Sequence, residues 1–334
     1  MDKILNIVKV VDTHTEGMPT RVVLSGAPKF KGANMNEKRL DFENNHDDFR
    51  KLLVNEPRGH GAMSGAILLP PINPIADFGV LYFEVSGCLP MCVHGTIGVA
   101  TAIIAEKLVK VTYPQTKVVL DTPAGLVDAV VEVSEDLSPL SVTVKNVDSF
   151  FIGSGVVEFG LVENTKKNIN YKLAYGGNIY AVVECEELGF LLSETPAQKL
   201  IDVGLALIRE IEKLMVIPQR EQIKSFQLRH IILAQYTNTN EFRAATVIKP
   251  GWIDRSPCGT GTSAHLVALA HEGNLNIGEK IISKSFIGSE FIGLLEKSEK
   301  RDNYTPYISG RAWVMARSEI YLYESDIFPL GFIL

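Results

Sequence analysis

The chain has 334 residues, of which 46% are hydrophobic and 22% charged, so a soluble globular protein with room for two domains is expected. Its formal net charge is −6 at pH 7 and no run of Lys and Arg stands out, which argues against a nucleic-acid partner. No apolar run approaches the roughly 18 residues that a membrane span needs, so no membrane association is expected.

The N-terminal segment and the cysteines indicate the compartment. Residues 1–12 alternate charged with apolar residues too often for a signal peptide and predict a strand. Four cysteines in a chain of this length, without a secretory signal, indicate reduced thiols and a cytoplasmic location. Cys88 and Cys92 do not have the spacing of a metal-binding pair, so no metal site is expected.

Local patterns predict two helices among many short strands. Residues 47–54 begin with acidic side chains that suit a helix N-terminus. After Thr195, apolar residues recur on one helical face as far as Met215, and this stripe is interpreted as packing. No Ser/Gly-rich linker marks a domain boundary. We place it so that residues 1–135 form a first half-domain and residues 136–334 a second. The C-terminal strand is expected to return to the first half-domain.

One stretch, Asp254–Ala264, places a cysteine where a turn leads into a helix. Pro257 ends the preceding strand, Gly259 and Gly261 permit close backbone approach, and apolar residues follow at helical spacing. The amides and the positive dipole end of a helix favour a thiolate, so the pKa of Cys258 is expected to fall from about 8.5 to roughly 3.5–7.5. The same amides can hold an anion.

A second copy of this arrangement lies far upstream. Cys92 again follows a proline and precedes a helical apolar pattern, and Gly95 aligns with Gly261 when the two cysteines are superimposed. The distance along the chain excludes a local metal hairpin. Two similar half-proteins, each presenting one thiol, are therefore predicted.

The segments around the two cysteines have three functional interpretations. A single thiol with His94 as base would suit a cysteine hydrolase, but the repetition would then be unexplained. The segment after Cys258 also matches a dinucleotide-binding loop weakly, without a preceding apolar strand or an acidic partner. Two facing thiols instead suit inversion of one carbon, in which a thiolate removes the α-hydrogen and the opposite thiol supplies a proton. Helix N-terminal amides would grip the substrate carboxylate, and no cofactor would be needed.

The motifs around both cysteines resemble those of the proline racemase family, which includes 4-hydroxyproline 2-epimerases and trans-3-hydroxyproline dehydratases. The likeness runs along the whole chain. The matching segments are 12–21, 56–60, 91–98, 176–181, 254–261 and 310–313.

This resemblance implies an α/β (α+β) fold like that of diaminopimelate epimerase. Two pseudo-symmetric domains would each have a curved, mostly antiparallel sheet around a central helix. It also implies that Cys92 and Cys258 form the acid/base pair, acting on proline or 4-hydroxyproline as a small-molecule substrate, and that the protein is a homodimer. The residues expected to contact the substrate are Val93, His94, Gly95, Asp254, Gly259 and Thr260.

Several positions leave alternatives open. Family members usually have Gly where this chain has Val93, so a positive φ there would strain the residue and its bulk would narrow the pocket. Cys88, His14 and His60 are candidate pocket residues, and each has a structural interpretation as a buried thiol or a turn-bracing side chain. Both thiols are present, which favours inversion. A hydroxyproline dehydratase and an inactive binding protein are the alternatives.

Overall fold

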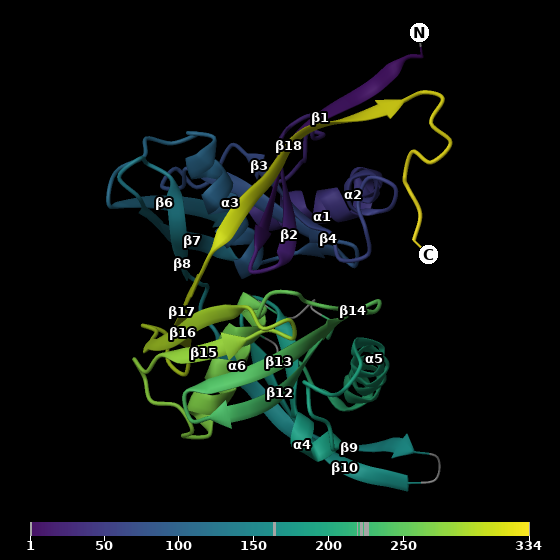
Figure 1. Ribbon diagram of the computed structural model, residues 1–334, viewed down its shortest axis with the longest axis vertical. Helices are drawn as coiled ribbons and strands as arrows, with labels where there is room; N and C mark the ends of the chain where they lie inside the picture. Colours follow the sequence, from purple (N-terminus) through teal and green to yellow (C-terminus); the bar gives the residue numbers. More distant parts are fainter. Residues whose placement is uncertain (1, 163–164, 219, 221–222, 224–226, 334) are drawn as a thin grey trace. The chain divides into compact units, whose positions relative to one another are not determined.

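The computed structural model describes residues 2–162, 165–218, 220, 223 and 227–333. The chain forms two compact units (Figure 1): unit 1 is Met1–Val144 with Ser309–Leu334, and unit 2 is Lys145–Ile308. The chain passes between them within β8 (Pro139–Lys145) and again within β17 (Tyr304–Gly310). The division into half-domains at residue 135 stays a prediction.

Unit 1 is built on a mostly antiparallel sheet. Its strands are β1 (Ile4–Thr15), β2 (Met18–Ser25), β3 (Ser64–Leu69), β4 (Phe78–Glu84), β5 (Gly87–Leu89), β6 (Gln115–Thr122), β7 (Gly125–Val133) and β18 (Ala312–Tyr323). They pair in the order β18-β1-β2-β3-β4-β6-β7, and the short β5 also pairs with β4. Only the β2–β3 and β4–β6 pairs among these are parallel.

Unit 2 repeats this pattern strand for strand. Its strands are β9 (Phe150–Val162), β10 (Thr165–Tyr175), β11 (Ile179–Glu184), β12 (His230–Asn238), β13 (Glu241–Ile248), β14 (Trp252–Ile253), β15 (Ile281–Lys284) and β16 (Glu290–Lys297). They pair in the order β9-β10-β11-β12-β13-β15-β16, with β14 also on β13. The parallel pairs, β11–β12 and β13–β15, fall at the corresponding places.

The helices follow the same repeat. They are α1 (Met35–Asn45), α2 (Asp47–Val54) and α3 (Val93–Ala105) in unit 1, and α4 (Cys185–Leu188), α5 (Ala197–Leu214) and α6 (Gly259–His271) in unit 2. α3 packs on β18, β1, β2 and β7, and α6 packs on the equivalent β9, β10, β11 and β16. The expected fold class, two pseudo-symmetric halves with a central helix in each, is confirmed.

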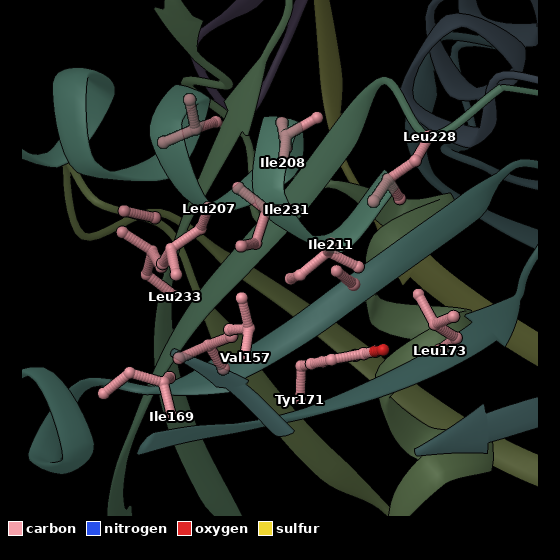
Figure 2. Packing of buried hydrophobic residues seen from close by; sticks show 14 of the residues in the cluster. Val157, Ile169, Tyr171, Leu173, Leu207, Ile208, Ile211, Leu228, Ile231 and Leu233 are labelled. Carbon is pink, nitrogen blue, oxygen red and sulfur yellow. The ribbon is translucent and has the colours of Figure 1, made fainter. Parts of the chain in front are cut away.

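The burial of the helices reflects their sequences. Nearly every residue of α3 and α6 is buried, which is the pattern of a helix surrounded by its own domain. α5 buries one face, including Leu207, Ile208 and Ile211, against strands β9, β12 and β13, in a cluster that also contains residues of β10 (Figure 2). The predicted helices at 47–54 and after Thr195 are confirmed as α2 and α5. In the part of the chain that the structure describes, no helix is long and apolar enough to cross a membrane.

Candidate active site

Each of the two cysteines singled out in the sequence caps the central helix of one unit. Cys92 is the N-cap of α3 and follows β5, and Cys258 is the N-cap of α6 and follows β14. Their exposed fractions are 5% and 4%, and both are free thiols. The two thiols therefore occupy equivalent places in the repeated fold, as the aligned motifs predicted.

A glycine lies three positions after each cysteine, where an added side chain would be crowded by its neighbours. A Cβ added to Gly95 would lie 3.0 Å from the sulfur of the capping cysteine and 3.2 Å from the ring of Tyr82. At Gly261 the corresponding distances are 2.9 Å to sulfur and 3.2 Å to the ring of Tyr180. In each half, the sulfur and an aromatic ring thus pack directly on the first turn of the helix.

Cys92 combines a helix amide with an imidazole. Its backbone is extended, with φ −149°, and its sulfur accepts a hydrogen bond from the Gly95 amide at 3.3 Å. The Nδ1 of His94 lies 3.4 Å from the sulfur and Nε2 lies 3.7 Å away. A proton donor from the backbone and a titratable ring therefore lie at the same thiol.

Two hydroxyl groups hold His94, and the one on Ser64 sets its tautomer. Ser64 Oγ lies 2.9 Å from His94 Nε2 and donates its hydrogen to the carbonyl oxygen of Pro19, while Thr15 Oγ1 donates to the His94 carbonyl at 2.8 Å. Because a carbonyl only accepts, the Ser64 hydroxyl has no hydrogen left for the ring and must accept one from Nε2. In neutral His94 the lone pair is then on Nδ1, the nitrogen nearer to the Cys92 sulfur.

Cys258 has a different setting. Its φ of 60° is in the left-handed region, which costs a non-glycine residue on the order of 1–3 kcal/mol. The preceding turn supports it, because Ser256 Oγ accepts from the Cys258 amide at 3.1 Å and donates to Asp254 Oδ1 at 2.8 Å. The hydroxyl of Tyr180 lies 3.4 Å from the sulfur. A carboxylate and a phenol thus replace the imidazole found at Cys92.

The pKa of the Cys258 thiol is raised rather than lowered, which corrects the sequence-based expectation. Burial is the largest cause, and the nearby Asp254 carboxylate adds to it, whereas the Tyr180 hydroxyl and the Gly261 amide lower the pKa. A helix N-terminus favours a thiolate, but removal from water disfavours any charge, and in this closed environment burial outweighs the helix.

A sequence model of the family described as "Proline racemase" matches residues 10–333. The chain belongs to the proline racemase family. This confirms the resemblance drawn from the motifs, and with it the expectation of an isomerase that racemises or epimerises.

Named relatives of this family member include both epimerases and racemases. It is 45% identical to a 4-hydroxyproline 2-epimerase of Streptosporangium roseum, over 97% of each chain. It is 34% identical to a proline racemase of Acetoanaerobium sticklandii, over 97% of this chain and 98% of that one. Among solved structures, a hydroxyproline epimerase from Agrobacterium vitis with bound trans-4-hydroxy-L-proline matches with a TM-score of 0.91 at 29% identity, covering 100% and 97% of the two chains.

Within this family fold, the residues expected to hold the substrate carboxylate begin the two central helices. Val93 is the first residue of α3 and Gly259 the first of α6. Val93 is 1% exposed and helical, so the strain considered for this position is absent there and lies instead on Cys258. Thr260 presents its hydroxyl to Tyr180 at 2.6 Å. The substrate-binding role of these residues stays a prediction.

The three candidate pocket residues have local partners in unit 1. His14 stacks on Trp313 with ring centroids 5.0 Å apart and accepts from the Gly17 amide, and exposed His60 accepts from the Ala62 amide. Cys88 lies opposite a β4 residue in the ladder, and burial raises the pKa of its thiol to about 12. Their roles as pocket residues stay predictions. Among the described residues, no group of three or more His, Cys, Asp and Glu side chains could hold a metal ion.

Sequence reasoning missed the polar residues that touch the predicted site residues. Thr15 and Tyr180 lie within the family-like segments and Ser64 lies four residues after one, yet nothing in their local pattern indicates which side chain they would contact. Each reaches its partner from a strand that is distant along the chain. Only the three-dimensional structure shows these contacts.

Proposed function

We propose that the protein is a 4-hydroxyproline 2-epimerase that inverts the α-carbon with Cys92 and Cys258 as its two acid/base groups. The observation that carries this proposal is the pair of buried thiols at equivalent helix N-termini, each beside its own proton-handling side chains. The substrate assignment is supported by 45% identity to a named 4-hydroxyproline 2-epimerase, against 34% to the named proline racemases.

In the proposed reaction one cysteine begins as a thiolate and the other as a thiol. The thiolate takes the α-hydrogen as a proton, and the electron pair remains on the α-carbon and its carboxylate. The thiol on the other face then gives its proton to the same carbon, which inverts the centre. After one turnover the proton has moved from one sulfur to the other, so the enzyme returns to its starting form by exchange with water or by reaction in the reverse direction.

The side chains around each thiol have distinct parts in this scheme. His94 Nδ1 can accept the Cys92 proton, which generates a thiolate and an imidazolium paired with each other. Helix N-terminal amides at Val93, His94, Gly259 and Thr260 would bind the carboxylate and stabilise the negative charge that develops during deprotonation. Asp254 is proposed to face the ring nitrogen of the substrate.

The test is a substrate panel in deuterated water, read by proton NMR and polarimetry. We expect trans-4-hydroxy-L-proline to gain α-deuterium and to yield cis-4-hydroxy-D-proline. Turnover of L-proline alone would instead indicate a proline racemase, and water loss from trans-3-hydroxy-L-proline a dehydratase. If no substrate reacts and the planar carbanion mimic pyrrole-2-carboxylate does not bind, the protein is no enzyme of this type.

Single substitutions test the two-thiol scheme. Cys92→Ser and Cys258→Ser should each lower the epimerisation rate by about 10²–10⁴-fold, because each removes one proton-transfer group. Cys185→Ala is the control, because Cys185 lies in the apolar core of unit 2. Epimerisation that persists at the normal rate in either serine variant would rule out the scheme.

The proposal also includes a cytoplasmic location and a homodimer. All four cysteines lie among the described residues as buried free thiols, which suits a reducing compartment. The outer strand β18 exposes Trp313, Met315 and Tyr323, an apolar surface of the kind that subunit contacts cover. Light scattering of the purified protein tests the dimer, and a monomer mass would reject it.

A further inference from the structure

The hydroxyl group of Tyr180 lies between two polar atoms of the second half-site. It is 2.6 Å from Thr260 Oγ1 and 3.4 Å from the Cys258 sulfur. The ring comes from β11, is 1% exposed and packs on the Gly261 turn, with His230 of β12 against it at a centroid distance of 4.9 Å. The phenol is therefore fixed in place beside the thiol.

The corresponding ring in unit 1 makes a different contact. Tyr82 also packs on the glycine of its helix turn, and its hydroxyl lies 2.6 Å from Thr96 Oγ1. Tyr82, however, comes from β4, whose equivalent in unit 2 is β13 rather than β11. The two halves have thus placed a tyrosine on the same turn from non-equivalent strands, and the Tyr180 hydroxyl lies within hydrogen-bond distance of the Cys258 sulfur.

The Tyr180–Thr260 pair can bond Cys258 in both of its protonation states. When Cys258 is a thiol, its S–H donates to the phenol oxygen and the phenol donates to Thr260 Oγ1. When Cys258 is a thiolate, the phenol O–H donates to the sulfur and the Thr260 hydroxyl donates to the phenol oxygen. The change needs only the reorientation of two hydroxyl hydrogens, because each group has one donor and a free lone pair.

Cys258 needs such a donor more than Cys92 does. Cys92 accepts a capping hydrogen bond from the Gly95 amide. Cys258, at a φ of 60°, forms no side-chain capping hydrogen bond. The Gly261 amide is nevertheless close enough to the Cys258 sulfur to lower the pKa of that thiol. Cys258 is also buried beside Asp254, which opposes negative charge on sulfur. A charge-assisted hydrogen bond from a neutral phenol would offset part of this cost.

We propose that Tyr180, supported by the Thr260 hydroxyl, is a positioning residue that orients the Cys258 sulfur and stabilises its thiolate form. Its importance for catalysis rests on the proposed function, but the effect on the thiol does not. Among the described residues of unit 2, the titratable groups near the thiol include Asp254 on the preceding turn, Tyr180 on β11 and His230 behind the phenol ring. Burial and the proximity of Cys258 raise the pKa of Tyr180 well above its ordinary value, so the phenol keeps its hydrogen.

The experiment measures the titration of each thiol in the full-length protein. The pH dependence of iodoacetamide alkylation is followed separately for the Cys258 and Cys92 peptides by mass spectrometry. In Tyr180→Phe, which keeps the ring, we expect the Cys258 midpoint to rise by about one pH unit. The Cys92 midpoint should be unchanged. A second measurement follows the ultraviolet absorbance of the thiolate as a function of pH. Subtracting the curve of the matching Cys258→Ser variant gives the midpoint of Cys258, and this midpoint does not depend on access of the alkylating reagent.

Three variants separate this role from simple packing. Tyr82→Phe removes an equally buried hydroxyl from the other half and should leave the Cys258 midpoint unchanged. Thr260→Val should raise the midpoint, and Thr260→Ser, which keeps the hydroxyl, should restore it. An unchanged Cys258 midpoint in Tyr180→Phe, or an equal rise in Tyr82→Phe, would overturn the inference. A raised midpoint in a protein that does not epimerise hydroxyproline would support this inference while rejecting the proposed function.

Discussion

The two cysteine sites have the same place in the fold and different local chemistry. Cys92 has extended backbone, a capping amide and His94, whereas Cys258 has left-handed backbone, a phenol and the Asp254 carboxylate. A repeated fold therefore fixes where a thiol lies but leaves its chemical surroundings to side chains that differ between the halves. In the proposed mechanism, in which the two thiols work alternately as acid and base, this arrangement would let each thiol be tuned independently.

One difference between the two central helices is a buried histidine. His265 lies two turns after Cys258 in α6, where α3 has buried Val99, and burial lowers the pKa of His265 to about 3. A neutral His265 therefore contributes stability that is complete above its unfolded pKa near 6.5 and is lost as the pH falls toward 3.

We expect His265→Val, which makes α6 resemble α3, to remove this acid sensitivity. Between pH 6.5 and 4 the free energy of unfolding of the wild type should lose up to about 3 kcal/mol through this residue. Urea titrations at several pH values measure the loss. Tyr236→Phe removes the hydroxyl 2.8 Å from His265 Nε2 and should keep the pH dependence. If the free energy of unfolding of His265→Val falls with decreasing pH as steeply as that of the wild type, His265 is not the cause of the acid sensitivity.

Alanine at the two helix-turn glycines tests whether both halves pack equally tightly. Gly95→Ala and Gly261→Ala should each destabilise the protein by about 1–3 kcal/mol and reduce activity, because the new methyl group would push on a sulfur and a tyrosine ring. Thermal unfolding and the epimerisation assay measure both effects. Gly153→Ala is the matched control, since no atom lies within 4 Å of the added Cβ. If Gly95→Ala or Gly261→Ala leaves stability and activity unchanged, the methyl group is accommodated at that turn and the expected crowding is contradicted.

The smallest effect is expected at the tautomer of His94, which has no counterpart at Cys258. Ser64→Ala removes the acceptor of the Nε2 hydrogen, so both tautomers of neutral His94 become accessible and kcat should fall by about tenfold. The change in stability should be modest, because the ring remains packed. Nitrogen NMR of labelled histidine reports the tautomer directly. If His94 keeps its Nε2 hydrogen in the alanine variant, Ser64 does not set the tautomer.

The sequence predicted those parts of the site that local pattern encodes. A proline, a cysteine and a glycine three positions later occur twice, and the structure shows a physical reason: each turn is packed against a sulfur and a ring. The apolar stripe of α5 was equally clear. The short polar helix α1 was not predicted, because its buried residues Met35, Arg39 and Phe42 do not form an apolar stripe.

What the sequence could not supply is contact between distant strands and exclusion of water. Ser64 reaches His94 from β3 and Tyr180 reaches Cys258 from β11, and no local period connects either pair. The expected low pKa of Cys258 was wrong for the same reason. A helix N-terminus is visible in a sequence, whereas the burial that opposes it depends on the whole fold.

The pairing of β1 with β18 has a consequence for how the protein is made. Unit 2 is one continuous stretch of chain, so all of its strands are synthesised before β18 is. Unit 1 cannot complete its sheet until β18 has left the exit tunnel, which leaves one side of α3 uncovered during synthesis. The first half to be started is thus the last for which all strands have been made, and a chain truncated before residue 312 would lack a strand that covers α3.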